Sequence, residues 1–280
     1  MINRKKIKAL IDLIDKEPAL KPQLQASLAR IIREEPIQFK NVIEENFGTN
    51  VPEYIKDMVV NIKRDELVPA FEHYFNLKNP SLLNGFVLIA KLVNPYLSQK
   101  QLLAKFEVLQ KKLACNIDRS FDIYHKTQLL SDLFFVEWDY RLESLNAGAK
   151  TVSLPDIISS HRASSFAMAV LYCCCAECFD IKADMFDAGG KVMIRLRDKY
   201  SYEPVYVDVF AAGRFVGEDE CNIYAAAHGF AWSGVMIVPL SSKQIIKRFL
   251  GNLIYIYSKN GVGGTIDTVR KCFACALKFV

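Results

Sequence analysis

The chain has 280 residues, a formal net charge of +5 at pH 7, and a composition that is 51% hydrophobic and 24% charged. Such proportions are typical of a globular protein and exclude a disordered one. The charge is small and is not gathered into a basic block with interleaved aromatic residues, so we predict no nucleic-acid partner. No apolar run reaches the ~18 residues that a membrane span requires, so we expect no membrane partner either.

The N-terminus and the cysteines both bear on the cellular compartment. The N-terminal segment contains basic side chains but no apolar stretch followed by a small-residue cleavage site, and so it does not read as a signal peptide. The eight cysteines of a chain this long are then expected to be reduced thiols rather than a disulfide framework. We therefore predict a cytoplasmic protein.

Residues 1–141 are predicted to form a helical bundle. Apolar side chains recur at helical spacing in two representative segments: Ile7, Leu10, Ile11 and Ile14, and Leu102, Phe106, Leu109 and Leu113. The helices are interrupted at Pro18, Pro22, Pro36, 48–52, 79–80 and 94–96. Short helices between such breaks fit an irregular bundle or HEAT-like helical pairs, and we favour the bundle because no fixed repeat period is present.

Residues 142–240 follow a different pattern. The sequence predicts a loop at 142–152 and one apolar helix at 164–179. Strand-like runs rich in β-branched and aromatic residues follow at 183–186, 191–197 and 205–210, with a turn at Gly189 and Gly190 and a further strand candidate at 234–238. A helix followed by an antiparallel meander is an α+β arrangement.

Residues 241–280 are predicted to form a helical hairpin. One apolar stripe holds Ile245, Phe249, Leu253 and Ile256 or Tyr257, and a second holds Ile266, Val269, Phe273 and Leu277. The glycine-rich stretch 260–264 between them reads as a turn, since it lacks the ending of a phosphate-binding loop. The pair has the size of one tetratricopeptide unit. The predicted fold class is therefore α+β and mostly α, in three parts: 1–141, 142–240 and 241–280.

A series of motifs in the middle of the chain resembles one family. The motifs are SLPDII from residue 153, HRASSFAMAVLY from 161, FDIK from 179, GKVMIR from 190, VDVF from 207 and KRFLGNL from 247. Each is weak alone, but their order and spacing resemble the bacterial SirB-type transglutaminase-like family. The last motif resembles the opening of that family's tetratricopeptide tail. The resemblance implies a transglutaminase-like helix and a small antiparallel sheet.

The resemblance also implies which residues stand at the catalytic positions. Enzymes of this superfamily use a cysteine at a helix N-terminus, a histidine beside it, and an aspartate that orients the histidine. The cysteine's position is Ser165 here, the histidine's is Lys191, and the aspartate remains as Asp208. Two of the three groups are replaced, so we expect no catalytic residue at these degenerate positions.

Lys191 could in principle serve Ser165 as a base. A lysine base must be neutral, which requires burial away from carboxylates. Asp208 would instead stabilise the ammonium form, so we predict a salt bridge between Lys191 and Asp208 across adjacent strands. We expect Ser164 and Ser165 to cap the helix that they begin.

The remaining candidates have structural interpretations. Cys173, Cys174, Cys175 and Cys178 lie two turns beyond the nucleophile's position, and the face formed by Ala167, Leu171, Cys174 and Cys178 predicts core packing. Zinc would need a second ligand cluster, for which Cys272 and Cys275 on a predicted helix are the one partner. We predict no metal and no cofactor, and we interpret His73, His125, His161 and His228 as structural.

Three functions remain open at this stage. We favour a non-catalytic scaffold or regulator that binds a protein or peptide through the retained cleft between helical elements. The alternative is a hydrolase or acyltransferase that uses Ser165 with Lys191, or a displaced cysteine. A transcription-linked regulator is suggested by the family's historical label alone. The identity of the partner and the oligomeric state stay open.

Overall fold

The structure is a computed structural model that describes residues 4–48, 50–97, 99–115, 121–188, 191–199, 203–227, 229, 238–260 and 263–279. It confirms an α+β fold that is mostly α-helical. The chain divides into two compact units, residues 1–68 and 69–280. Both boundaries of the predicted three-part division, 141/142 and 240/241, fall inside the second unit, and that division stays a prediction.

The first unit is built from α1 (Arg4–Lys16), α2 (Lys21–Glu34), α3 (Pro36–Phe47) and α4 (Glu53–Asp65). Its core contains the apolar stripe predicted for the first helix, with Ile7, Ile11 and Ile14 buried among Leu28 and Ile31 of α2. The predicted breaks at prolines coincide with helix starts, because proline fits the first turn of a helix, where its missing N–H is not needed.

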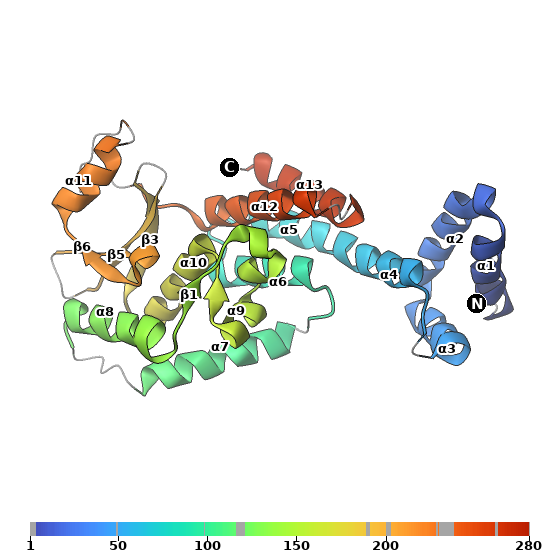
Figure 1. Ribbon diagram of the computed structural model, residues 1–280, viewed down its shortest axis with the longest axis horizontal. Helices are drawn as coiled ribbons and strands as arrows, with labels where there is room; N and C mark the ends of the chain where they lie inside the picture. Colours follow the sequence, from blue (N-terminus) through green and yellow to red (C-terminus); the bar gives the residue numbers. More distant parts are fainter. Residues whose placement is uncertain are drawn as a thin grey trace. The chain divides into compact units, whose positions relative to one another are not determined.

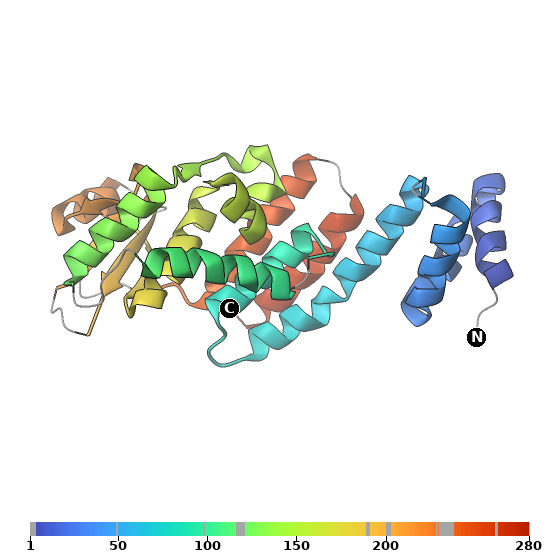
Figure 2. The same ribbon diagram turned by 90° about the horizontal axis from the view of Figure 1, so that it is seen from below.

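The second unit holds the remaining elements. Its helices are α5 (Leu67–Asn76, which begins at the boundary), α6 (Leu82–Val93), α7 (Gln99–Ala114), α8 (Ile123–Asp132), α9 (Leu154–Ser160), α10 (Ser165–Ala176), α11 (Glu218–Ala227), α12 (Ser242–Lys259) and α13 (Gly263–Leu277). Both views show α12 and α13 side by side (Figures 1 and 2). None of the helices in the described ranges is long and apolar enough to cross a membrane.

A four-stranded antiparallel sheet has the order β3-β4-β5-β6, with β3 (Lys182–Asp187), β4 (Val192–Arg197), β5 (Val205–Asp208) and β6 (Arg214–Val216). Consecutive side chains of β4 and β5 point to opposite faces and are nearly all buried, so both faces of the sheet are covered. Helices α8 and α10 pack on one face. Helix α11 lies by the other face (Figure 1), where its Cys221 packs with Met193 and Tyr206. A second sheet pairs β1 (Arg141–Leu142) with β2 (Arg162–Ala163) in parallel.

Several predictions of local structure hold. The stripe Leu102, Phe106, Leu109 and Leu113 of α7 is buried, as is the stripe Ile245, Phe249, Leu253, Ile256 and Tyr257 of α12. The three predicted strands appear as β3, β4 and β5. The turn at Gly189 and Gly190 and positions 234–237 of the fourth predicted strand lie outside the described residues, as does His228.

Other predictions need correction. The predicted loop 142–152 contains two short 3-10 helices, Leu145–Ala147 and Ala149–Val152, on either side of Gly148, whose positive φ of 105° suits glycine. Helix α10 is buried all round rather than on one face, because strands β3 and β4, helix α6, strand β2 and the two neighbouring 3-10 helices pack against it. In α13, Leu277 is 57% exposed, and Cys272 and Ala276 take its predicted place in the core.

Candidate functional site

The N-terminus of α10 is the position at which the sequence predicts Ser165 in place of the superfamily's catalytic cysteine. Ser164 is the helix N-cap, and its hydroxyl accepts a hydrogen bond from the N–H of Ala167 at 3.4 Å, which confirms the predicted capping role for this residue. Ser165 is the first helical residue and is half-buried. The helix itself is fixed by Tyr172, whose hydroxyl lies 2.9 Å from that of Ser131 in α8. This contact ties α10 to α8.

Lys191 and Asp208 form the predicted salt bridge. Lys191 precedes β4 and Asp208 ends β5, and because these strands are adjacent the two side chains meet. Lys191 Nζ donates to Asp208 Oδ2 at 2.6 Å. The other carboxylate oxygen, Oδ1, accepts the N–H of Phe210 at 2.8 Å and so caps the 3-10 helix Val209–Ala211. The Asp208 side chain is completely buried, whereas that of Lys191 is 23% exposed.

The electrostatics of the pair keep the lysine charged. Partial burial by itself lowers the pKa of Lys191, but the hydrogen bond and negative charge of Asp208, joined by Tyr224, outweigh it and raise the pKa above its ordinary value of 10.5. A general base needs the opposite shift, because only the neutral amine can accept a proton. Lys191 is therefore an ammonium group at physiological pH.

Aromatic side chains surround the ammonium group of Lys191. Its Nζ lies 4.2 Å from the ring centroid of Tyr224 in α11 and 5.7 Å from that of Phe210, within the range of cation–π attraction. The hydroxyl of Tyr224 donates to Glu220 Oε1 at 3.1 Å, and Glu220 pairs with Arg214 of β6. The bridge thus belongs to a network that joins the start of β4, the end of β5, the start of β6 and helix α11.

Tyr224 and α11 were missed by the sequence analysis. The helix has few apolar residues at helical spacing, since only Cys221 and Ala225 are buried. A usable signal was present in its first turn, where Glu218, Asp219 and Glu220 suit the positive end of a helix dipole.

Ser165 is not joined to the bridge. Among the described residues, no hydrogen bond or ion pair connects Ser165 with Lys191 or Asp208. The neighbouring Phe166 is covered by Arg248 of α12, whose guanidinium lies 4.8 Å from the ring centroid. Arg248 also pairs with Asp187 of β3 at 3.5 Å. Ser165 and Lys191 therefore do not form a nucleophile–base pair in this structure.

The cysteines of α10 are buried thiols, as predicted. Cys173, Cys174 and Cys175 are at most 4% exposed, and burial raises the pKa of each thiol. Cys178 is half-buried, and its Sγ accepts a hydrogen bond from Gln110 at 2.6 Å. Within the described ranges, no three or more histidine, cysteine, aspartate or glutamate side chains are grouped as a metal site.

More than half of the chain matches a known family. A profile of the transglutaminase-like superfamily matches residues 100–251, more than half of the chain. The chain belongs to the transglutaminase-like superfamily. No curated protein and no solved structure matches it. The region shared with this superfamily begins in α7 and ends in α12, and it contains Ser165, Lys191, Asp208 and Arg248.

Proposed function

We propose that this transglutaminase-like chain is a non-catalytic scaffold or regulator that binds a protein or peptide. The observation that carries the proposal is the contact of 2.6 Å between Lys191 and Asp208, in which a charged lysine stands where the superfamily's catalytic histidine is expected. A histidine can exchange a proton near neutral pH, and this ammonium group cannot. With Ser165 at the cysteine's position, the proton acceptor and the thiolate are both replaced.

A proposed subfamily within the superfamily is consistent with the same function. We propose a degenerate member of the SirB-type branch, which we expect in bacteria, with α12 and α13 as a tetratricopeptide-like pair. Helical elements of this kind typically bind other polypeptides. The chain is then expected to act in the cytoplasm, without metal or cofactor, and without contact with nucleic acid or membrane.

The competing function is a hydrolase or acyltransferase that uses Ser165 with Lys191. It would require Lys191 to release Asp208, lose its proton and move to the Ser165 hydroxyl. The raised pKa of Lys191 opposes the second of these steps.

Labelling with an activity probe distinguishes the two functions. The folded chain, treated with a fluorophosphonate and analysed by peptide mass spectrometry, should show no more modification at Ser165 than at the neighbouring Ser164. The reason is that an unactivated serine hydroxyl is a weak nucleophile. Ser165→Ala and Lys191→Met variants serve as matched controls. Stoichiometric labelling at Ser165 that disappears in both variants would establish the enzyme and overturn the scaffold.

A further inference from the structure

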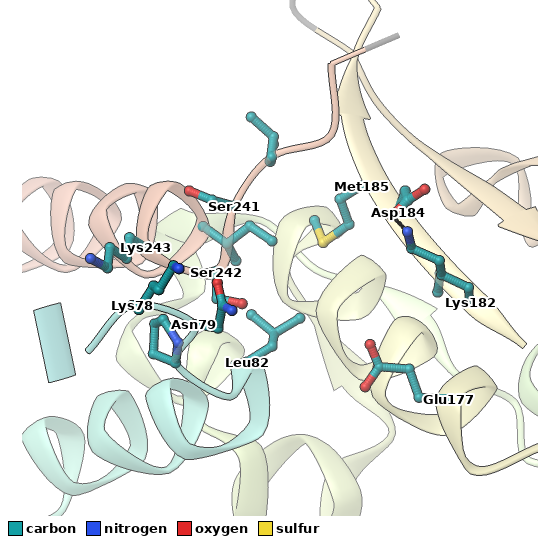
Figure 3. A pocket seen from close by; sticks show the side chains of 14 residues that line it. Lys78, Asn79, Leu82, Glu177, Lys182, Asp184, Met185, Ser241, Ser242 and Lys243 are labelled. Atoms are coloured by element: carbon teal, nitrogen blue, oxygen red, sulfur yellow. Dashed lines mark ion pairs between the residues drawn. The ribbon is translucent and has the colours of Figure 1, made fainter. Parts of the chain in front are cut away.

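A second site in residues 69–280 consists of a cavity of about 390 Å³. It lies between β3, the N-terminus of α12 and the segment that joins α5 to α6. Figure 3 shows Lys78, Ser241 and Ser242 on one side of this cavity, with Met185, Lys182 and Glu177 on the other. Its volume falls within the ordinary range of ligand pockets. None of the three residues of the Lys191 site (Ser165, Lys191 and Asp208) lines it.

One wall of the cavity is the outer edge of β3, which is paired at Met185 and unpaired at Ala183 within the described residues. The carbonyl of Met185 points away from β4, because it accepts the N–H of Leu240 at 2.7 Å. In an antiparallel strand, the N–H and C=O of residue i−2 point the same way, so those of Ala183 also face outward. In the described part of the chain no group pairs with them. An extended peptide can hydrogen-bond to such an edge.

The opposite wall is electropositive. The capping box of α12 uses Ser241 and Gln244, which leaves the N–H groups of Ser242 and Lys243 without a partner among the described residues. These groups lie at the positive end of an 18-residue helix. Lys78 adds an ammonium group on the same side (Figure 3). The Lys243 side chain is engaged elsewhere, at 5.9 Å from the Phe279 ring centroid.

The two acidic side chains that line the cavity, Glu177 and Asp184, both lie on its β3 side. Asp184 is neutralised by Arg195 at 3.0 Å, by Arg197 and by Lys182 at 4.0 Å. Glu177 stands across from the α12 N-terminus (Figure 3), and burial, together with the charge of Asp184, raises its pKa. A carboxylate is attracted to the Lys78 side, because both acidic residues that line the cavity, Glu177 and Asp184, lie on the opposite side. Charge complementarity therefore selects the end at which a negative group sits.

We propose that this cavity binds the carboxy-terminal end of a partner polypeptide. The last residues of the partner extend along the outer edge of β3 and hydrogen-bond to the backbone of Ala183. The terminal carboxylate lies against Lys78 and the free N–H groups of Ser242 and Lys243. This inference rests on the proposed function, since it names the kind of partner and the surface that holds it.

The test uses random-sequence hexapeptides, anchored by their N-termini, in two forms: with free terminal carboxylates and with terminal carboxamides. The full chain should select free-acid peptides, and the same sequences as amides should bind about tenfold more weakly or worse, because a charge-assisted hydrogen-bonded contact is lost. Lys78→Glu should weaken binding to a similar extent. Lys150→Glu, an equal charge change at an exposed lysine that does not line the cavity, should leave binding unchanged.

A second variant tests the strand edge. Ala183→Pro removes an N–H that is not used in pairing with β4, so β3 should persist while peptide affinity falls. Equal binding of acids and amides, wild-type affinity in Lys78→Glu, or no selected peptide would overturn the inference. None of these results would be evidence that Ser165 is an activated nucleophile, so the proposed function would stand. Labelling of Ser165 would instead overturn the proposed function alone.

Discussion

Replacing Lys191 with methionine should lower the free energy of unfolding of the second unit by about 3 kcal/mol. The change leaves the carboxylate of Asp208, which is completely buried, without its cation. Asp208→Asn should cost less, about 1–2 kcal/mol, since the partly exposed ammonium group can turn towards water and the amide oxygen can still accept the N–H of Phe210. Chemical denaturation followed by tryptophan fluorescence reports on this unit, because both tryptophans, Trp138 and Trp232, belong to it.

The double variant separates a true pair from two independent residues. Lys191→Met combined with Asp208→Asn should cost about 1–2 kcal/mol less than the sum of the single changes, because the second substitution removes the charge that the first one strands. Lys278→Met is the control. Lys278 forms an exposed ion pair with Glu72 at 3.7 Å in the same unit, which should contribute less than about 1 kcal/mol. Additive costs, or a Lys191→Met variant as stable as Lys278→Met, would contradict a structural bridge.

Thiol labelling should divide the cysteines sharply. In the folded chain at pH 8, Cys115, which is exposed, should react with iodoacetamide at least about a hundredfold faster than Cys173, Cys174 or Cys175. Cys173, Cys174 and Cys175 are buried, and burial raises the pKa of each thiol. Each can therefore react only when the surrounding structure opens locally and exposes it. Burial, with help from Glu220 and Glu218, likewise raises the pKa of Cys221 to about 11.

Isotope-coded alkylation with peptide mass spectrometry measures all eight rates at once. In denaturant the differences should vanish, which controls for local sequence effects on thiol reactivity. A cysteine of α10 that reacts as fast as Cys115 in the folded chain would identify an activated thiol. That outcome would restore the enzyme that uses a displaced cysteine.

Two kinds of feature could be predicted from the sequence: regular apolar stripes on helices, and a pair of opposite charges on neighbouring strands. The stripes of α7 and α12 are regular, so their buried faces could be predicted from spacing alone. The bridge was also predictable, because the resemblance to the transglutaminase-like family placed Lys191 and Asp208 on neighbouring strands, where opposite charges attract. No distant contact was needed for either inference.

The rest depends on tertiary contacts that leave little trace in the sequence. Helix α11 buries only Cys221 and Ala225, and its contribution to the site, Tyr224, is a single aromatic ring. Strand β6 has three residues, too few for an alternating pattern. The cavity beside β3 arises where segments about 100 and 60 residues apart in the chain meet, at Lys78, Ala183 and Ser242. The spacing of apolar residues within one segment carries no information about which distant segments come into contact.

The pKa of Lys191 tests most directly whether the superfamily's catalytic position holds a structural cation. It can be measured by NMR titration of the full chain with ¹³C-labelled lysine, with the Lys191 signal assigned by its loss in Lys191→Arg. The Asp208 contact predicts that Lys191 titrates above 10.5. A lysine that activates Ser165 would have to titrate near neutrality, below about 8. That result would contradict a structural cation at this position.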